Sequence, residues 1–226
     1  MNCAIIAAGG KGVRFGSDIP KQRVLLNGRS ILARAIAPFE DEKLLAEIFL
    51  VYPQEEEEAT YRQLIQSEGF RKVKLVAGGD SRFDSVRHGF LSLPVCEVVL
   101  IHDAARPLVT NTLVSAVLKK AREVGAAIPA LPVHETVKRV EEHQILQTLP
   151  RDVLHLAQTP QGFRYEVLKK AYDEIGSSYA APSWTDESMM VEELGIPVAM
   201  VLGEKRNLKI TDAEDMRIAE FLLGKS

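Results

Sequence analysis

Short runs of apolar residues alternate along this chain with stretches in which apolar residues recur at helical spacing. The apolar runs have the length of buried strands, and we expect strands at residues 3–7, 47–52, 72–76, 97–102, 126–131 and 197–202. Strands that alternate with amphipathic helices are typical of βαβ units around a mostly parallel sheet. The pattern therefore predicts an α/β fold in which helices flank such a sheet.

The segments between these strands carry signals for the starts and ends of helices. Polar residues that accept hydrogen bonds are expected at the first position of a helix, proline near its start or after its end, and acidic residues in its first turn. The expected limits are Ser30 to Pro38, Pro53 with the acidic run 55–58 in the first turn, Asn111 to Val124, and Asp212 to Leu223.

Residues 133–150 interrupt the alternation of strands and helices. Two runs typical of strands, 136–140 and 145–148, surround a polar turn at 141–144. An isolated two-stranded hairpin is marginally stable in water, so we expect this arm to pack on a second subunit. The sequence predicts a single domain, residues 1–226, with a protruding β-hairpin arm at about 133–150.

Composition narrows the class of protein. The formal net charge of -3 leaves no overall basic surface, so nucleic acid is not the expected partner. The first residues have the pattern of a strand rather than a signal peptide, and no run approaches the roughly 18 apolar residues that span a bilayer. Cys3 and Cys96 are expected to be buried thiols, with a single disulfide as the alternative. We therefore expect a soluble cytoplasmic protein with no membrane partner.

A glycine-rich loop, AGGKGVRFG at residues 8–16, follows the first expected strand. Glycine permits positive φ and a close approach of the backbone to a ligand, and successive N–H groups in such a loop bind anions. The loop lacks the GK[ST] of a Walker motif, and Phe15 stands where a dinucleotide fingerprint needs its third glycine. Arg14 and Lys21 flank the loop, as a triphosphate would require. The alternative is a structural turn beside ordinary surface cations.

Polar residues also follow the later strands. GGD (residues 78–80) and Ser85 could read the edge of a base, or could form a glycine turn and a helix cap. Asp103 and Arg106 follow a buried strand, where they could contact a ligand's hydroxyl groups and an anion, or form an internal ion pair. We expect His102 to be structural, because nothing near it in the sequence completes a metal or catalytic pattern.

Two cations in the second half of the chain are less distinctive. Arg151 follows Pro150 and would by itself be ordinary surface charge. Lys209 has apolar neighbours, as on a short strand, and a lysine on a strand is better positioned for a ligand than one on a mobile loop.

Taken in order, these motifs resemble the family of cytidylyltransferases that act on 2-C-methyl-D-erythritol 4-phosphate. Phe15 replaces the usual methionine of the first block, which exchanges one large apolar side chain for another. The blocks run in family order over nearly the whole chain. They are AGGKGVR (8–14) with PKQ (20–22), GGDSRFDSV (78–86), HDAARP (102–107), TVKR (136–139), TPQ (159–161), TDE (185–187) and NLKIT (207–211).

The resemblance implies a Rossmann-like nucleotidyltransferase fold and a reaction in which CTP, with Mg²⁺ on its phosphates, gives its cytidylyl group to the acceptor phosphate. It also implies a homodimer whose arm reaches toward the partner's site. The implied nucleotide-binding residues are Ala8, Gly9, Gly10, Gly12, Gly79, Asp80 and Ser85, of which the last three select cytosine. The implied acceptor-binding residues are Asp103, Arg106, Thr136, Thr159 and Thr185, with Thr136, Arg151 and Thr159 on or beside the arm. Arg14 and Lys21 are assigned to the transition state, and Arg151 and Lys209 to positioning the acceptor.

Two alternatives stay open at this point. The nearer is a ribitol 5-phosphate cytidylyltransferase, from a sister family with the same nucleotide loop. Ala105 and the pair Lys138-Arg139 favour methylerythritol phosphate, because the sister family usually has valine at the first position and lacks the basic pair. The second is a nucleotide-binding regulator without catalysis, against which the presence of all four assigned cations speaks.

Overall fold

The first apolar run forms the centre of the sheet in the computed structural model, which describes residues 1–8, 21–175 and 184–224, with only the backbone of Lys21 and Ile175. Every residue of β1 (Asn2–Ala7) is buried, and β1 pairs in parallel with β4 (Leu45–Tyr52) and β6 (Val98–Asp103). β5 (Val73–Ala77) pairs in parallel with β4. The carboxyl ends of these strands therefore meet at one edge of the sheet.

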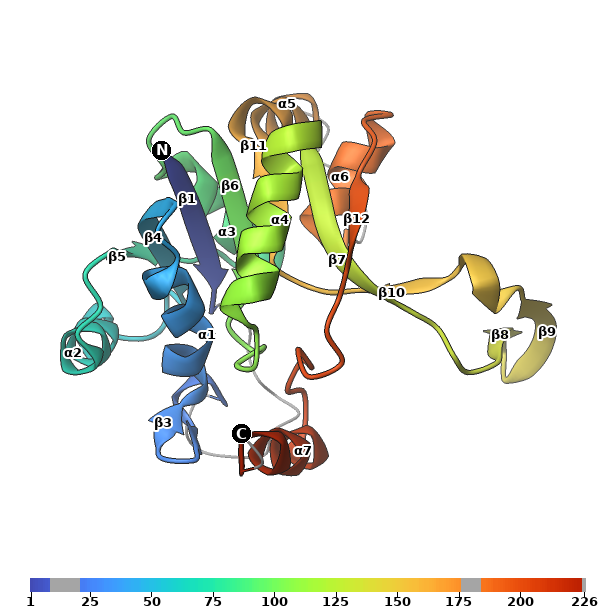
Figure 1. Cartoon of the computed structure of the whole chain (residues 1–226), viewed down its shortest axis with the longest axis horizontal. Coiled ribbons are helices and arrows are strands. Elements are labelled where there is room, and N and C mark those ends of the chain that lie inside the picture. The colour runs from blue at the N-terminus through green and yellow to red at the C-terminus, as the bar shows by residue number, and fades with distance from the viewer. Residues whose placement is uncertain (9–20, 176–183, 225–226) are drawn as a thin grey trace.

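The other half of the sheet is mixed in direction. β11 (Gln161–Arg164) runs antiparallel to β6 and to β7 (Ala126–Pro132), and β10 (His155–Ala157) runs antiparallel to β7. β12 (Ala199–Leu202) is parallel to β7. The strand order is β10-β7-β11-β6-β1-β4-β5, with β12 on β7 (Figure 1). All six expected strands are present within two residues of their predicted limits, so the mostly parallel α/β prediction is confirmed. Two strands of this sheet, β10 and β11, were not predicted from the sequence.

Helices cover both faces of the sheet because alternate residues of each central strand point to opposite sides. On one face, Ile6 packs with apolar residues of α1 (Ile31–Asp41), α2 (Glu58–Glu68) and α4 (Asn111–Val124). On the other face, Ile5 packs with α3 (Arg82–Leu91), α5 (Tyr165–Ile175) and α6 (Glu187–Glu193). A smaller cluster holds α7 (Ala213–Gly224) against α1 and the short hairpin β2 (Leu25–Leu26) and β3 (Arg29–Ser30).

The helix α1 corrects one prediction. Ser30 caps it as expected, accepting a hydrogen bond from the Ala33 N–H at 3.1 Å. Pro38 lies inside the helix and does not end it, since α1 continues to Asp41. The turn after the proline is retained because Phe39 is fully buried in the core and the Asn111 side chain donates to the Pro38 carbonyl at 2.8 Å.

Two other helix starts differ from prediction. α2 begins at Glu58 rather than at Pro53, because the residues between them form a turn in which the Glu56 N–H donates to the Pro53 carbonyl at 3.0 Å. Thr110, not Asn111, caps α4 and accepts from the Leu113 N–H at 3.1 Å. Asn111 is instead the first helical residue.

The expected limits of the last helix agree more closely. Asp212 accepts hydrogen bonds from the first turn of α7, as predicted, and the helix ends one residue beyond Leu223. No helix in the described ranges is both long enough and apolar enough to cross a membrane. Cys3 and Cys96 are buried and not linked by a disulfide, as expected.

The predicted arm is present as a separate two-stranded sheet. β8 (Val137–Glu141) and β9 (Gln144–Leu149) pair with each other and stand away from the central sheet (Figure 1). Glu142 and His143 form the turn with φ values of 45° and 66°, the left-handed conformation that a two-residue hairpin loop requires. Most of its side chains are exposed, so the hairpin gains little from burial within this chain.

Candidate functional site

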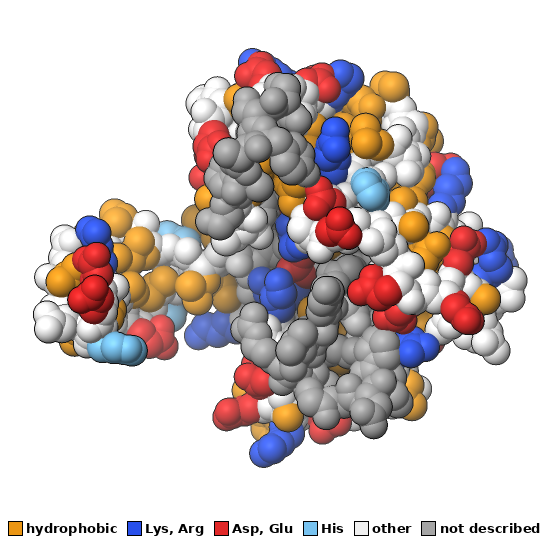
Figure 2. Space-filling view, turned by 180° about the vertical axis from the view of Figure 1, so that it is seen from behind, with side chains coloured by type: hydrophobic (Ala, Val, Ile, Leu, Met, Phe, Trp, Pro, Cys, Tyr) orange, Lys and Arg blue, Asp and Glu red, His pale blue; other side chains and the backbone are white. Residues whose placement is uncertain are grey.

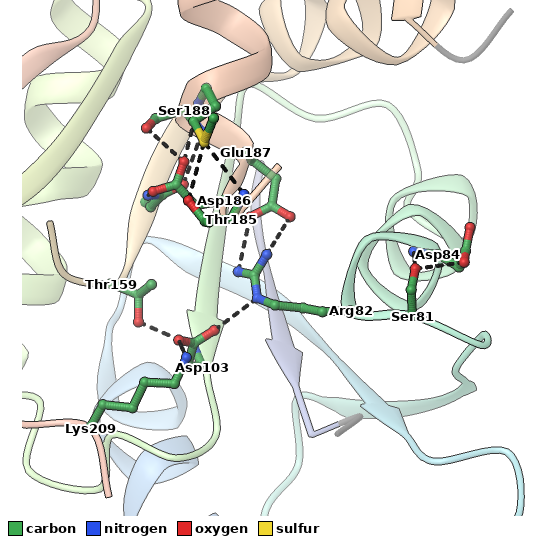
Figure 3. Close-up of polar contacts among 12 residues, drawn as sticks. Ser81, Arg82, Asp84, Asp103, Thr159, Thr185, Asp186, Glu187, Ser188 and Lys209 are labelled. Atoms are coloured by element: carbon green, nitrogen blue, oxygen red, sulfur yellow. Dashed lines mark hydrogen bonds and ion pairs between the residues drawn. The ribbon is translucent and has the colours of Figure 1, made fainter. Parts of the chain in front are cut away.

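Four charged side chains from distant parts of the chain meet beyond the carboxyl end of β6 (Figure 3). Asp103, the last residue of β6, receives the Lys209 ammonium on Oδ2 at 2.8 Å and the Arg82 Nε on Oδ1 at 3.2 Å. The other two guanidinium nitrogens of Arg82 donate to the two carboxylate oxygens of Glu187, at 2.9 and 3.1 Å. One arginine therefore bridges two carboxylates, and one carboxylate bridges two cations.

The charges in this network are strongly coupled because most of them are removed from water. Burial alone would raise the pKa of Asp103, but Arg82 and Lys209 outweigh it and hold the pKa well below its usual range. Burial disfavours the charged form of Arg82, yet the neighbouring Glu187 and Asp103 raise its pKa. Burial raises the pKa of Glu187, and the contact with Arg82 opposes that shift. Asp103 is thus a stable anion with both oxygens engaged.

A chain of hydrogen bonds fixes the backbone beside Asp103. The Asp103 N–H donates to Thr159 Oγ1 at 3.1 Å, and this hydroxyl lies 2.9 Å from His102 Nδ1. His102 Nε2 lies 3.2 Å from the Arg106 carbonyl, which can only accept, so we assign the proton to Nε2 and the acceptor role to Nδ1. Burial lowers the pKa of His102 to about 4, so the ring is neutral and structural, as expected.

Thr159 does not lie beside the arm, which corrects the sequence-based placement. It is buried between β10 and β11, because β10 returns the chain from the arm to the central sheet. Its two contacts, to the Asp103 backbone and to the His102 ring, instead make it a support for Asp103.

Lys209 is not on a strand, which corrects a second expectation. Its segment, residues 207–210, crosses the end of the sheet and is held by single contacts to the turn that follows β6. The Ile210 N–H donates to the Ala105 carbonyl at 2.8 Å, and Arg106 Nη1 donates to the Asn207 carbonyl at 2.8 Å. Arg106 therefore positions the segment that carries Lys209, and the ion pairs of Asp103 come from Arg82 and Lys209 instead.

The loop after β5 combines a tight turn with a helix cap. Ser81 caps α3 and accepts from the Asp84 N–H at 3.0 Å. Ser85 Oγ accepts from the Gly79 N–H at 3.0 Å, and a Cβ at Gly79 would lie 2.5 Å from the Cβ of Asp84. Asp80 is exposed at the tip. The packing by itself requires glycine at position 79, and selection of cytosine by Gly79, Asp80 and Ser85 stays a prediction.

Most of the predicted phosphate loop lies outside the described residues, including Gly9, Gly10, Gly12, Arg14 and the side chain of Lys21. The two ends of this segment are placed. The Ala8 N–H donates to the Val51 carbonyl at 2.9 Å, and the Gln22 side chain donates to the Ala8 carbonyl at 2.6 Å. Ala7 pairs with Asp103 across β1 and β6, so Ala8 follows the end of β1 beside the charged network.

The remaining predicted residues lie on the surface. Thr136 and Arg151 are exposed at the base of the arm, where Arg151 Nη1 donates to the His134 carbonyl at 2.6 Å. Thr185 is exposed just before α6, and its hydroxyl lies 3.1 Å from Met189 Sδ. Seen from behind, charged side chains are spread over the visible face of the body, and the arm extends to one side (Figure 2).

Sequence reasoning assigned no role to Arg82 and Glu187, which the structure places in the charged network with Asp103. Both belong to motif blocks that were identified, but each adjoins a residue with a more obvious role, and neither was assigned one. They stand 105 positions apart, and no local pattern indicates that they pair.

The described part of the chain supplies no cage for a metal ion. None of its His, Cys, Asp and Glu side chains form a group of three or more that could hold one. The carboxylate of Asp103 already forms ion pairs with the side chains of Arg82 and Lys209.

Comparison with known proteins places this geometry in a family. The model of the 2-C-methyl-D-erythritol 4-phosphate cytidylyltransferase family, IspD, matches residues 2–225. The chain belongs to this family. The IspD relative from Geobacter metallireducens is 42% identical over 225 residues, which is 97% of this chain and 96% of that protein. A bifunctional IspD/IspF enzyme from Anaeromyxobacter is 43% identical, and the match covers 56% of it.

Solved structures of IspD proteins have the same fold. The enzyme from Thermus thermophilus aligns with a TM-score of 0.81 and 32% identity, covering 98% of both chains. The synthase from Anaerococcus prevotii aligns with a TM-score of 0.86 and 28% identity, covering 99% of this chain and 96% of that one. The Rossmann-like nucleotidyltransferase fold implied by the sequence resemblance is confirmed.

Proposed function

We propose that this chain transfers the cytidylyl group of CTP to 2-C-methyl-D-erythritol 4-phosphate. The products are pyrophosphate and the CDP-methylerythritol intermediate of non-mevalonate isoprenoid precursor synthesis. The family match over residues 2–225 supports the reaction. The observation that carries it structurally is the pairing of Ala7 with Asp103, because it sets Ala8, the first residue of the glycine-rich motif, next to a residue assigned to the acceptor.

In the reaction, an oxygen of the acceptor phosphate attacks the α-phosphorus of CTP in line, and the bond to the leaving pyrophosphate breaks. The acceptor phosphate is already an anion near neutral pH, so the attack needs no general base. The protein therefore acts by positioning the two substrates and by neutralising the charge that accumulates on the phosphoryl oxygens. We assign this neutralisation to Arg14 and Lys21.

Lys209 and Asp103 fit the acceptor side of this reaction. The Lys209 side chain is 43% exposed, so its ammonium is accessible while Asp103 holds its direction. A bound acceptor phosphate would compete for this ammonium, and the Asp103 carboxylate would then accept hydrogen bonds from the acceptor's hydroxyl groups. Arg106 supports this arrangement from behind through the backbone of Asn207.

We treat Mg²⁺ as part of the nucleotide substrate rather than as a resident cofactor. Magnesium in such enzymes is bound largely by substrate phosphates and water. This agrees with a described donor set in which Asp103 already serves Arg82 and Lys209. Titration of activity with free Mg²⁺ at fixed CTP should follow the concentration of the Mg²⁺–CTP complex.

We also propose that the enzyme is a homodimer in which Arg151 acts with Thr136 at the partner's site. Arg151 is exposed, and large apolar side chains are exposed on the arm and at its base, among them Ile145, Leu146 and Leu156 (Figure 2). Exposed apolar surface of this kind marks an interface. A cytoplasmic location agrees with two buried, unpaired thiols.

One screen tests the function directly. CTP, UTP, ATP and GTP are each incubated with methylerythritol phosphate and with ribitol 5-phosphate, and pyrophosphate release is measured. We expect turnover with CTP and methylerythritol phosphate. A large preference for ribitol phosphate would assign the chain to the sister activity, and no pyrophosphate from any pair would indicate a non-catalytic nucleotide-binding protein.

The variant Lys21→Ala tests the assignment of the transition-state cations. Its turnover should fall about a hundredfold, because one well-placed charge contributes on the order of 3 kcal/mol to a phosphoryl transition state. Lys170→Ala is the control, because Lys170 is half exposed in an i,i+4 pair on α5. Turnover by Lys21→Ala that matches this control would remove Lys21 from the mechanism.

A further inference from the structure

Arg82 is placed to orient the carboxylate of Asp103, the residue that we assign to acceptor binding. It begins α3, yet its three nitrogens reach two other parts of the chain, the end of β6 and the start of α6. Glu187 takes both terminal nitrogens of the guanidinium, in a bidentate contact that fixes the plane of the group. The remaining donor, Nε–H, is then directed at Asp103 Oδ1.

The burial of this pair points to a role in positioning rather than in stability. Glu187 is 1% exposed, and replacing a buried ion pair with apolar residues is often neutral or stabilising. Tyr172 and Phe83 lie nearby in an apolar cluster, so apolar residues would be accommodated here. What such residues could not do is direct a hydrogen-bond donor at Asp103.

Each oxygen of the Asp103 carboxylate has its own partner. Arg82 donates to Oδ1, Lys209 donates to Oδ2, and the backbone N–H of Asp103 donates to Thr159. These contacts fix the orientation of the carboxylate and keep it ionised. Loss of the Arg82 contact would free the carboxylate to rotate and would change the direction of the Lys209 ammonium.

We propose that Arg82 and Glu187 are positioning residues for the acceptor. In this proposal, which rests on the proposed function, Glu187 orients Arg82, and Arg82 orients the Asp103 carboxylate that meets the acceptor's hydroxyl groups and directs Lys209. Because Arg82 begins α3 and Glu187 begins α6, the same pair also joins the first turns of these two helices.

The charged groups that face Asp103 determine how each variant should respond to pH. They are Arg82 on α3, Lys209 on its crossing segment, Arg106 after β6 and Glu187 on α6, and neutral His102 precedes it. Removal of Arg82 takes away an opposite charge, so the pKa of Asp103 rises. Removal of the Glu187 charge takes away a like charge, so the pKa of Asp103 does not rise.

Three variants separate the positive charge of Arg82 from the orientation that its guanidinium gives to Asp103. Arg82→Gln removes the charge and the orientation. We therefore expect KM for methylerythritol phosphate to rise at least tenfold and the acidic limb of kcat/KM to move to higher pH. Arg82→Lys keeps the charge without the planar fork, so KM should rise while the acidic limb stays in place. Glu187→Gln should raise KM about threefold to tenfold, with no upward movement of the limb.

Two controls accompany these variants. Arg122→Gln breaks an arginine–glutamate pair with Glu97, just before β6 and so at the opposite edge of the sheet, and should leave KM and the pH profile unchanged. The Kd for CTP, measured by calorimetry, should change less than threefold in all variants. Thermal unfolding of each variant shows that the assays are made on folded protein.

A measurement without turnover keeps the inference separate from the proposed function. The ¹³C carboxyl resonance of Asp103, assigned by its absence in Asp103→Asn, is titrated in the wild type and in Arg82→Gln. We expect its titration to move to higher pH in the variant. A wild type that does not use methylerythritol phosphate would refute the proposed function, while the titration would still decide whether Arg82 controls Asp103.

A purely structural pair would behave differently. Arg82→Gln and Glu187→Gln would then unfold at lower temperature but keep the wild-type KM for the acceptor and the wild-type acidic limb of kcat/KM. That set of results would overturn the proposal.

Discussion

The end of β6 and the arm present their functional candidates in opposite ways. At the end of β6, Asp103 is fixed by contacts with Lys209 and Arg82, and Arg82 by Glu187, all from segments up to 106 positions away. Beside the arm, Arg151 is exposed, and its guanidinium donates to the nearby His134 carbonyl, 17 positions away. The first region is organised by the fold of one chain, whereas the second leaves its side chains largely exposed.

This difference indicates how the functional groups of the enzyme are held in position. A site needs its groups held in direction before substrate arrives, since ordering them afterwards costs conformational entropy. The network at β6 meets this need within the subunit. In our proposal the arm meets this need by packing on a partner, which is why the dimer and the function of Arg151 belong to the same proposal.

The largest expected effect is a loss of kcat/KM, and it is tested by changing Lys209 and Arg151 separately. Either residue changed to alanine should lower kcat/KM for methylerythritol phosphate about a hundredfold, on the order of 3 kcal/mol. Their effects on the free energy of unfolding should differ. Lys209→Ala should cost up to about 1 kcal/mol, because its 43% exposed ammonium is screened and Asp103 keeps Arg82, and Arg151→Ala less than about 0.5 kcal/mol.

Mixing these two inactive variants shows whose site Arg151 serves. If the arm completes the partner's site, a mixed dimer carries one site with both native residues. Randomly mixed dimers should then recover roughly a quarter of the wild-type rate, since half are mixed and each has one complete site. A mixture as inactive as its components would place Arg151 in its own subunit's site, or outside catalysis.

The second prediction concerns acid and the buried network. The pKa of His102 is lowered to about 4 by burial, below its unfolded value near 6.5, so between these values the unfolded chain binds a proton that the folded chain does not. Stability should therefore fall by about 2 kcal/mol between pH 7.5 and 5 on account of this group. The ion pairs of Asp103 contribute nothing to this loss, because its lowered pKa keeps it ionised throughout the range.

Urea unfolding of the wild type and of His102→Gln across this pH range isolates the effect. The glutamine cannot gain the proton, so the difference between the two curves should change by the amount stated above. Curves that stay parallel would show that His102 does not titrate differently in the folded and unfolded chains.

A smaller effect tests the arm as an interface. Ile145 and Leu146 are 65% and 51% exposed, and changing either to aspartate places a charge where an apolar contact is proposed. The dissociation constant of the dimer should rise at least tenfold, about 1.4 kcal/mol, in sedimentation experiments. Lys170→Gln, on the exposed surface of α5, serves as the control. A dimer of unchanged affinity in both aspartate variants would place the interface elsewhere.

The smallest effect concerns the turn of the arm. Glu142 and His143 both have positive φ, a conformation that asparagine and glycine adopt more readily. The double change Glu142→Asn with His143→Gly should stabilise the hairpin by about 0.5–1 kcal/mol. Amide exchange in β8 and β9 should slow accordingly, while exchange in β1 stays the same. Faster exchange in the hairpin would show that native side chains at the turn matter more than its backbone conformation.

Several features of this protein were determined by the sequence alone. The six apolar runs became strands because each contains enough apolar surface to require burial, and Ser30 and Asp212 became caps because their side chains bond to the adjacent backbone. The hairpin formed where two β-prone runs flank a short polar turn. These are local effects, so neighbouring residues carry the information.

Other features were decided only by the tertiary structure. Pro38 stays within α1 because Phe39 is buried, and β10 and β11 are short segments that became strands because β6 and β7 offered open edges. Arg82 and Glu187 form an ion pair although they lie 105 positions apart in the sequence. Burial and charge pairing depend on what the folded sheet brings together, and no window of sequence contains both partners.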